Sequence, residues 1–466
     1  MDSRSPRSIE DHRSPGSFRD PSGFIFERDG TLYRQVNRFY RADYDLLVGS
    51  GLDRALIDDG LLIPHREVDA EPSDRASVYK VLRPDRVPFV SYPYEWCFGQ
   101  LKAAALLTLE IQRRAMERGM SLKDASAFNI QFVGGRPIFI DTLSFEAYRE
   151  GEPWVAYRQF CRHFLATMAL MGRSDVRLNQ LFRTSLDGVP LDLASRILPW
   201  KSRLDLRLLI HIHLHAGAEN AYASGPPTKV RGFSRRALLG LVDSLAATVR
   251  SLRWEPRGTE WADYYGATNY TDAATIRKLE LVSGFLDEAR PSTVWDLGAN
   301  TGRFSRLAAD RGASTVAFDV DPACVERHFR EVAGRGEANI LPLRMDLTNP
   351  SPSLGWDHWE RASMIARGPA DVAMALALIH HLAITGNVPL GRVAAFLRRA
   401  CHRLIIEFVP KDDSQARRLL ASRADVFEDY SKEGFERAFA EHFTIDRAQP
   451  IVESGRTLYL MHAGSG

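Results

Sequence analysis

The chain of 466 residues is long enough for two or three domains, and 45% hydrophobic with 26% charged residues is ordinary for a soluble globular protein. The 61 Lys and Arg nearly balance the 59 Asp and Glu, so the net charge of +2 gives no general attraction for nucleic acid. Four separated cysteines without a CxxC pair or a secretory leader favour the cytoplasm, and charges interrupt every long apolar run, so we expect no membrane span.

Residues 1–20 are rich in Ser, Arg, Pro and Asp, and we expect a disordered tail because they cannot bury enough apolar surface to fold. An α+β domain is predicted for residues 21–223. It opens with GFIFERDGTLYRQVN, two strand-like runs joined by Asp29-Gly30, a dipeptide typical of a tight hairpin. A long helix near 99–118 and a second hairpin, turning at Gly134-Gly135, follow.

Five residues of this domain are faintly similar to functional residues of protein-kinase-like phosphotransferases. Lys80 and Glu95 match the strand lysine and its partner glutamate on a helix. Asp124 matches the catalytic-loop Asp, Asn129 the metal-binding Asn, and Asp141 the second metal-binding Asp. The resemblance implies a degenerate kinase-like domain with a vestigial nucleotide site. Leu122 replaces the family's usual His, and no glycine-rich phosphate loop precedes the lysine. The alternative is an α+β substrate-binding or regulatory domain.

His211, His213 and His215 alternate along the chain. On a strand they would share one face and could hold a metal, whereas on a helix they spread around it. The surrounding sequence is rich in helical patterns, so we predict no metal site. The stretch SGPPTK then ends this region, and we assign residues 224–253 to a linker and connecting helix.

Residues 254–466 alternate strand and helix patterns, which predicts an α/β domain with a parallel sheet covered on both faces. The strand candidates are STVWDLG, STVAFDV, ANILPLRMD, ADVAMALAL, HRLIIEFV and RTLYLMHA. Such sheets bind ligands beyond the carboxyl ends of their strands. Acidic residues follow the first three strands at those ends, namely Asp296, Asp319 and Asp346.

The segments DLGANTG, AFDVDP, RMDLT and DVAMALALIHHL, in this order, resemble the first four motifs of class I S-adenosylmethionine-dependent methyltransferases. The resemblance covers roughly residues 254–463 and implies a Rossmann-like fold that binds S-adenosylmethionine. It implies that the turn of Gly298, Asn300 and Gly302 lies beside the methionine portion. It also implies that Asp296 orders this loop or the cofactor's amino group. By the same resemblance, Asp319 holds the ribose hydroxyls and Asp346 binds the adenine amine.

Two positions of this match leave alternatives open. Asp321 competes with Asp319 for the ribose, and we prefer Asp319 because it directly follows an apolar run. Asn300 stands where the family usually has glycine. Asn tolerates a left-handed backbone, so we expect the turn to persist, with the side chain contacting the cofactor or narrowing its pocket.

Candidates for catalysis lie after the fourth and fifth strands. His380 and His381 would lie at the mouth of the pocket, where an imidazole suits a general base; the alternative is a structural role. Glu407 sits in an apolar run and either faces the substrate cleft or pairs with a base such as Arg456. Aromatic residues before the first strand form either a flap or ordinary packing: Trp261, Tyr264, Tyr265 and Tyr270.

Taken whole, the chain also resembles a two-part bacterial family that includes rhizobial nodulation host-specificity methyltransferase-like proteins. We therefore expect S-adenosylmethionine-dependent methyl transfer to an oxygen or nitrogen of an unidentified small molecule, glycan or protein. Two other functions are retained as alternatives. One is an ATP-dependent phosphotransferase acting through the N-terminal domain, and the other is a non-catalytic binding or scaffold protein.

Overall fold

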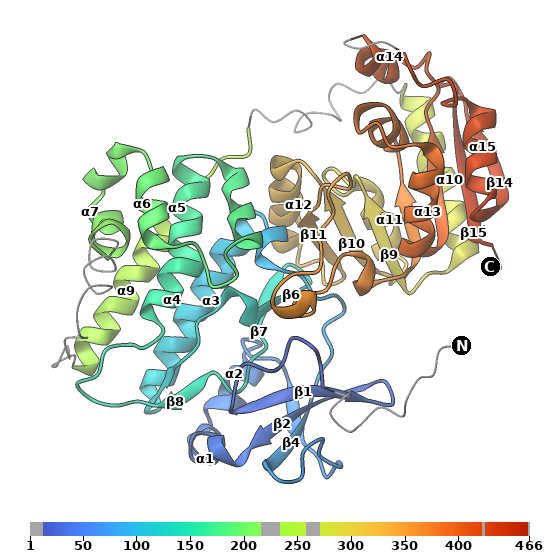
Figure 1. Cartoon of the computed structure of the whole chain (residues 1–466). Coiled ribbons are helices and arrows are strands. Elements are labelled where there is room, and N and C mark those ends of the chain that lie inside the picture. Colours follow the sequence, from blue (N-terminus) through green and yellow to red (C-terminus); the bar gives the residue numbers. More distant parts are fainter. Residues whose placement is uncertain (1–12, 216–233, 258–270, 422–424, 465–466) are drawn as a thin grey trace. The chain divides into compact units, whose positions relative to one another are not determined.

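The protein is described from a computed structural model that defines residues 13–215, 234–257, 271–421 and 425–464 (Figure 1). The chain divides into two compact units. The first unit contains the chain up to Trp254 together with Leu354–Arg361, and the second contains Glu255–Ser353 and Ala362–Gly466. Within the described part, no helix has the length and apolar character needed to cross a membrane.

The first unit begins with a four-stranded antiparallel sheet in the order β1-β2-β4-β3. Its strands are β1 (Gly23–Arg28), β2 (Thr31–Asn37), β3 (His65–Glu67) and β4 (Val78–Pro84). Asp29 and Gly30 have φ values of 49° and 72°, which is the conformation that a type I′ turn requires. The predicted hairpin therefore connects β1 and β2, and Val36 and Leu82 bury one face of this sheet.

The rest of the first unit is mainly helical, with two short strand pairs. The helices are α1 (Arg41–Gly49), α2 (Leu52–Asp58), α3 (Phe98–Glu117), α4 (Tyr157–Phe160), α5 (Ala166–Arg173), α6 (Leu191–Ile197), α7 (Leu206–Leu208) and α9 (Arg235–Ser251). The pairs join β5 (Met120–Leu122) to β8 (Phe145–Ala147) and β6 (Ile130–Val133) to β7 (Arg136–Phe139). Gly134 and Gly135, both with positive φ, form the second predicted hairpin turn.

The tail predicted for residues 1–20 does not extend to residue 20, because residues 13–20 lie against β1. The Ser14 N–H donates to the Ile25 carbonyl at 2.8 Å, and the Arg13 guanidinium lies 3.7 Å from the centre of the Phe24 ring. Backbone hydrogen bonds and a cation–π contact need no large apolar side chain in the segment itself. A composition-based prediction therefore misses them.

Helix α9, predicted as part of a linker, belongs to the first unit and packs along α3. Lys102 Nζ donates to the Leu252 carbonyl at 2.8 Å, and the Arg235 guanidinium donates to the Met116 carbonyl at 2.6 Å. One face of α9 is buried at helical spacing by Leu238, Val242, Leu245 and Val249. The Pro/Gly-rich break precedes this helix, so it does not mark the end of the unit.

The second unit is built on a seven-stranded sheet in the order β11-β10-β9-β12-β13-β15-β14. Its strands are β9 (Thr293–Leu297), β10 (Ser314–Asp319), β11 (Ile340–Arg344), β12 (Ala370–Ala375), β13 (Cys401–Phe408), β14 (Phe443–Ile451) and β15 (Arg456–Ala463). The first five are parallel, in the Rossmann-like order 3-2-1-4-5, which confirms the predicted α/β sheet. One edge of the sheet is not parallel as predicted, because β15 runs antiparallel to β13 and to the unpredicted strand β14.

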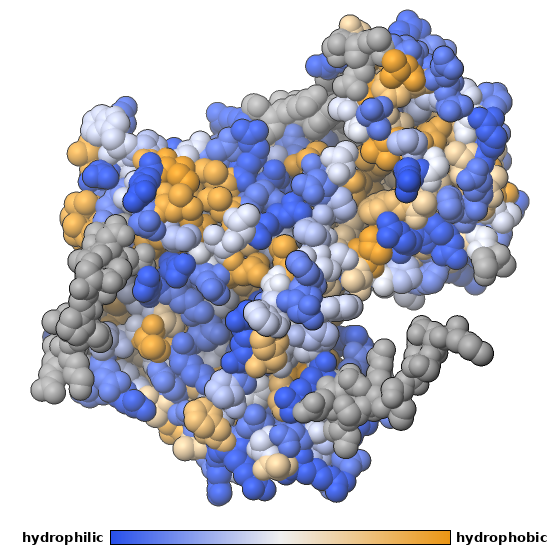
Figure 2. Space-filling view, in the orientation of Figure 1, coloured by the Kyte–Doolittle hydropathy of each residue, from blue (hydrophilic) through white to orange (hydrophobic). Residues whose placement is uncertain are grey.

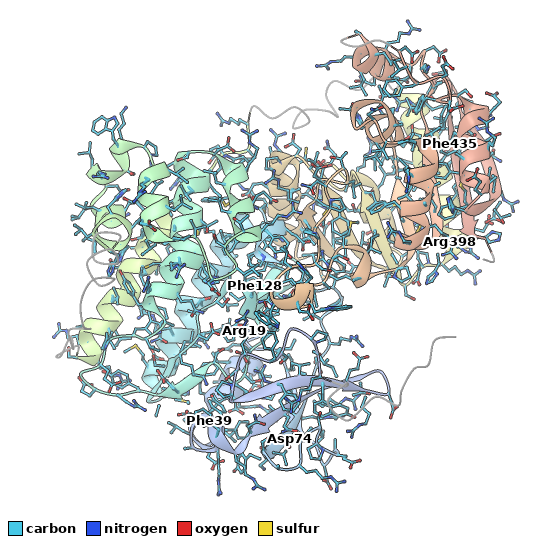
Figure 3. The ribbon with its side chains drawn as sticks, in the orientation of Figure 1. Arg19, Phe39, Asp74, Phe128, Arg398 and Phe435 are labelled. Atoms are coloured by element: carbon cyan, nitrogen blue, oxygen red, sulfur yellow. The ribbon has the colours of Figure 1, made fainter. Side chains whose placement is uncertain are left out.

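Helices cover both faces of this sheet (Figure 1). The helices described in this unit are α10 (Asp272–Ala289), α11 (Arg303–Ala309), α12 (Pro322–Arg335), α13 (Leu390–Ala400), α14 (Ser414–Leu420) and α15 (Lys432–Ala440). Val282 and Phe285 of α10 join Val294 and Met374 in the core on one face. On the other face Phe435 of α15, labelled in Figure 3, lies 5.1 Å from Tyr459 between ring centres. The carboxyl ends of the parallel strands are left open between these helical layers.

Candidate functional site

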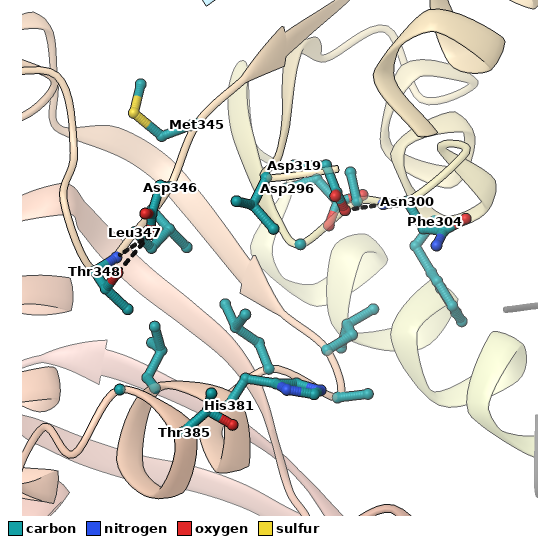
Figure 4. Close-up of a pocket in the computed structure, with 18 of the residues that line it drawn as sticks. Asp296, Asn300, Phe304, Asp319, Met345, Asp346, Leu347, Thr348, His381 and Thr385 are labelled. Atoms are coloured by element: carbon teal, nitrogen blue, oxygen red, sulfur yellow. Dashed lines mark hydrogen bonds between the residues drawn. The ribbon is translucent and has the colours of Figure 1, made fainter. Parts of the chain in front are cut away.

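A cavity of about 430 Å³ lies at the carboxyl ends of β9, β10, β11 and β12 (Figure 4). In the strand order, β9 and β12 are the neighbours where the sheet reverses direction of growth, which is where open α/β sheets bind ligands. Five of the six residues predicted to bind the cofactor line this cavity: Asp296, Gly298, Asn300, Asp319 and Asp346. The sixth, Gly302, does not line the cavity and packs against His328.

The turn after β9 is held in a left-handed conformation at three alternate residues. Gly298, Asn300 and Gly302 have φ values of 78°, 50° and 80°. A Cβ atom at Gly302 would lie 2.0 Å from the imidazole of His328, so only glycine fits there. Gly302 is also the residue that precedes the first turn of α11. Of the two predicted glycines, Gly298 therefore lines the cavity, and Gly302 allows the close approach of His328.

Asn300 keeps the turn intact without being glycine. Its Oδ1 accepts a hydrogen bond from the Thr301 N–H at 2.8 Å, the local bond that makes a left-handed Asn tolerable. Its own N–H donates to Asp319 Oδ2 at 2.7 Å. The side chain also lines the cavity, so Asn300 joins the glycine turn to the acidic end of β10.

Asp319 and Asp321, the two candidates for binding the ribose, have different positions. Asp321 does not line the cavity; its Oδ1 caps α12 by accepting from the Ala323 N–H at 2.7 Å. Asp319 lines the cavity and is only 8% exposed, and burial raises its pKa to about 6. Backbone N–H groups of Asn300 and Asp321 donate to its two oxygens and favour its charged form.

Asp296 is the most buried acid of the site. Its Oδ2 accepts a hydrogen bond from the Ser305 hydroxyl at 2.6 Å. Burial, reinforced by the nearby Asp319, raises the pKa of Asp296 to about 7. Two carboxylates brought together under low solvent exposure favour a positively charged ligand group between or beside them.

Asp346 lies beyond β11 on another wall of the cavity (Figure 4). It is exposed, and its Oδ1 accepts hydrogen bonds from the N–H and the hydroxyl of Thr348 at 2.8 and 2.6 Å. These two bonds fix the carboxylate at the rim of the cavity. Thr348 lines the cavity as well, and no sequence signal singled it out.

The two candidate histidines after β12 are not equivalent. His381 begins the short helical turn η12 (His381–Thr385) and lines the cavity, opposite Asp319 and Asn300 in Figure 4. His380 is 2% exposed and does not line it, although the two rings are 4.1 Å apart between centres. Burial lowers the pKa of His381 to about 4 and that of His380 well below its usual value. Both imidazoles are therefore neutral at neutral pH.

Glu407 does not face the cavity, contrary to one of its two predicted roles. It is fully buried and forms ion pairs with Arg456 at 3.2 Å and with Lys278 at 2.6 Å. Arg456 also pairs with Asp413 at 2.8 Å. The pairing with Arg456 was one of the two alternatives drawn from the sequence, whereas the Lys278 partner was missed.

Lys278 is the cavity residue that sequence reasoning overlooked most clearly. It lies on α10, is 5% exposed and lines the cavity together with Asp296. Burial lowers its pKa, and Glu407 opposes this effect. The available signal was a lysine on the apolar face of a helix, next in helical spacing to Ala274 and Leu281.

Comparison with known proteins places the whole chain in a family. Over 458 residues it is 36% identical to nodulation protein NoeA of Rhizobium meliloti (strain 1021), an alignment covering 96% of this chain and 95% of that protein. The chain belongs to the NoeA family. This confirms the predicted likeness to a rhizobial nodulation family that spans both parts of the chain. No protein-family model matches the chain.

Solved structures with similarity to the chain cover only part of it. The PH0226 protein from Pyrococcus horikoshii OT3 is 20% identical with a TM-score of 0.32, covering 44% of this chain and all of that chain. The N-methyltransferase NodS from Bradyrhizobium japonicum WM9 is 10% identical with a TM-score of 0.30, covering 42% of this chain and 98% of that chain.

In the first unit of this NoeA-family chain, three of the five kinase-like candidates lie close together. Asn129 donates a hydrogen bond to Asp124, and its amide also donates to the Ser144 hydroxyl at 3.2 Å. Asp141 is ion-paired with Arg34 and accepts from the same Ser144 hydroxyl. Burial opposes ionisation of Asp141, but Arg34 holds its pKa below the usual value. The acid predicted to bind metal is thus neutralised by arginine.

The other two candidates do not form the predicted lysine–glutamate pair. Lys80 Nζ pairs with Glu67 at 2.6 Å, on the neighbouring strand β3. Glu95 is fully buried, and its Oε2 accepts the Tyr92 N–H at 3.0 Å at the start of a helical turn. Sequence spacing could not distinguish the two glutamates. The structure therefore gives the phosphotransferase alternative no support.

The three alternating histidines lie in helical turns, as expected, and two of them, His211 and His213, form hydrogen bonds with protein hydroxyls. His211 bridges the Tyr157 hydroxyl at 2.9 Å and the Ser244 hydroxyl at 3.1 Å, and His213 bridges two serines. Across the described ranges, no group of three or more His, Cys, Asp or Glu could hold a metal. The aromatic residues considered as a flap, Trp261, Tyr264, Tyr265 and Tyr270, lie outside the described residues.

Proposed function

We propose that the chain is an S-adenosylmethionine-dependent methyltransferase that binds its cofactor in the cavity beyond β9 to β12. One observation carries the proposal. Asp296, Asp319 and Asp346 lie at the carboxyl ends of three successive strands and line one cavity with the left-handed turn. A cofactor with an amino acid portion, a ribose diol and an exocyclic amine offers donors to three such acceptors.

In this proposal each cavity residue meets one part of the cofactor. Asp319 accepts hydrogen bonds from the ribose hydroxyls, and Asp346 accepts one from the adenine amine. The backbone of residues 298–302 lies beside the methionine portion. Asp296 faces the cofactor's ammonium group, and Lys278, which also lines the cavity, faces its carboxylate. Asp296 and Lys278, two buried groups of opposite charge, are complementary to the ammonium and carboxylate groups of the methionine portion.

S-adenosylmethionine supplies an activated methyl group, so the chain must mainly hold the acceptor atom in line with it. We propose that His381, at the cavity wall opposite Asp319, holds the acceptor atom in line with the methyl group. With a pKa of about 4, its imidazole is neutral at pH 7 and accepts a hydrogen bond, but it is a weak base. Orienting an acceptor N–H or O–H is therefore its main contribution.

A ligand comparison on the full-length protein tests the proposed cofactor. S-adenosylhomocysteine should raise the melting temperature, because a ligand that binds only the folded state stabilises it. NADH and Mg-ATP should leave the temperature unchanged. Stabilisation by NADH instead would contradict the proposal, and stabilisation by Mg-ATP alone would favour a nucleotide-binding function of the first unit.

A further inference from the structure

The first unit carries an exposed apolar surface that the proposed methyl transfer does not use. It consists of residues 191–214, which form α6, the turn η7 (Trp200–Leu204), α7 and the turn η8 (Leu209–Leu214). We call it the helical patch. Its outward large apolar side chains are 36–74% exposed: Leu193, Ile197, Trp200, Leu204, Leu206, Ile210 and Leu214. Figure 2 shows hydrophobic side chains at the surface in the region of α6 and α7.

The helical patch is a fixed structure, because two part-buried hydrogen bonds of His213 join its parts. His213 on η8 lies 2.7 Å from the Ser195 hydroxyl on α6 and 2.9 Å from the Ser202 hydroxyl on η7. The patch also has its own inward face, formed by Leu198, Leu208 and Ile212, each no more than 5% exposed. The exposed apolar residues are therefore additional to those that the fold needs for its core.

Cations alternate with these apolar side chains. Arg196, Lys201, Arg203 and Arg207 are all exposed, and in the described part of the chain none of the four pairs with a carboxylate. The patch contains two acids, Asp192 and Asp205. Asp205 is engaged elsewhere, since it caps α7 and pairs with Arg173 at 3.4 Å. The exposed side chains thus combine apolar groups with free positive charge.

We propose that the helical patch binds the surface of an anionic lipid bilayer. Short helices with Trp and Leu side chains beside Lys and Arg are suited to lie in the interface, with the apolar groups among the acyl chains and the cations at the phosphates. A second copy of the chain fits this chemistry poorly. A two-fold interface would place the patch against itself, with four cations facing four cations.

Vesicle co-sedimentation of the full-length protein tests this proposal. The protein should sediment with vesicles of phosphatidylcholine and phosphatidylglycerol, bind pure phosphatidylcholine much less, and be released by salt. The Trp200→Ser/Leu204→Ser variant should lose binding. The Lys201→Gln/Arg203→Gln variant should bind about 25-fold more weakly, at about fivefold for each cation removed. Thermal unfolding of each variant checks that it is folded.

The matched control is Phe39→Ser, which removes an apolar side chain that is 76% exposed elsewhere in the first unit (Figure 3). It should bind anionic vesicles like the unaltered protein. Absence of binding by the unaltered protein, or an equal loss in the control, would overturn the proposal. So would a dimer that the Trp200→Ser/Leu204→Ser variant dissociates, since the patch would then be covered by a second copy.

Discussion

At the scale of single residues, Asn300 shows how a residue other than glycine can occupy a left-handed turn position while the backbone conformation is kept. Its φ of 50° is one that glycine adopts freely and that most side chains resist. The Oδ1 bond to Thr301 compensates locally. The sequence predicted this tolerance, but not that the Asn300 N–H would donate to Asp319.

We predict that Asn300→Gly keeps the binding of S-adenosylhomocysteine within a few-fold, because glycine adopts the same turn. Asn300→Val should weaken binding strongly, since a β-branched residue at positive φ distorts the turn at a cost of about 1–2 kcal/mol or more. Isothermal titration of both variants checks this. Equal affinities for the Gly and Val variants would show that the turn does not shape the pocket.

Asp296 gives a prediction about pH and stability. Its folded-state pKa of about 7 lies above the ordinary aspartate value of 3.8, so between these pH values the folded protein holds a proton that the unfolded chain releases. Stability therefore falls as pH rises from about 4 to 7. Asp296→Asn should remove this loss and stabilise the ligand-free protein at pH 8 by up to about 4 kcal/mol, with little gain near pH 4.

Denaturant titrations of Asp296→Asn at pH 4 and pH 8 measure that difference. Asp287→Asn is the matched control on α10, because hydrogen bonding to Arg311 lowers the pKa of Asp287. Its stability change should be small and of opposite sign at pH 8. If Asp296→Asn raised the free energy of unfolding equally at both pH values, burial would not raise the pKa of Asp296 as described.

At the scale of elements, a buried ionic network joins α10, β13 and β15. Lys278, Glu407 and Arg456 are each no more than 5% exposed, and Asp413 extends the network. An apolar run around a glutamate predicts that a partner must exist, because an unpaired buried charge is costly. It cannot say which basic residue, distant in the sequence, the fold will bring to it.

We predict that Glu407→Leu destabilises the second unit by about 3–5 kcal/mol, since it leaves two buried cations without their shared carboxylate. Urea unfolding checks this. The control is Asp58→Ala, which removes an exposed partner of Arg54 and should cost less than about 0.5 kcal/mol. Similar losses for the two variants would mean that the network contributes no more than a surface pair.

Strand prediction succeeded where strands are buried on both faces, including the edge strand β11, and failed at the more exposed edge strand β14. All six predicted strands of the second unit occur, because their continuous apolar runs are typical of a covered sheet. β14 was missed because only its first and last residues are buried. Helix α9 was seen as a helix, but its partner α3 lies far earlier in the chain, so its place in the first unit was not apparent.

At the scale of the whole molecule, the chain combines a first unit of antiparallel sheet and helices with a Rossmann-like second unit. The cavity residues at the strand ends were predictable, because parallel strands bring their carboxyl ends to one edge, whereas Lys278 and Thr348 were not. The preference for Asp319 over Asp321 came from the apolar run before Asp319, and Asp319 is the one of the two that lines the cavity. The separation of His381 from His380 depends on side-chain direction, which a sequence pattern does not give. The predicted pair of Lys80 with Glu95 does not form, because sequence spacing could not distinguish Glu95 from Glu67, the residue with which Lys80 pairs.

The most direct test of the proposed cofactor site is isothermal titration of the full-length protein with S-adenosylhomocysteine, alongside Asp319→Ala and His381→Ala. We predict measurable binding that Asp319→Ala abolishes and that His381→Ala leaves within a few-fold, since His381 is proposed to meet the acceptor. Binding that is absent from the unaltered protein, or that survives in Asp319→Ala, would contradict a cofactor held at the carboxyl ends of β9 to β12.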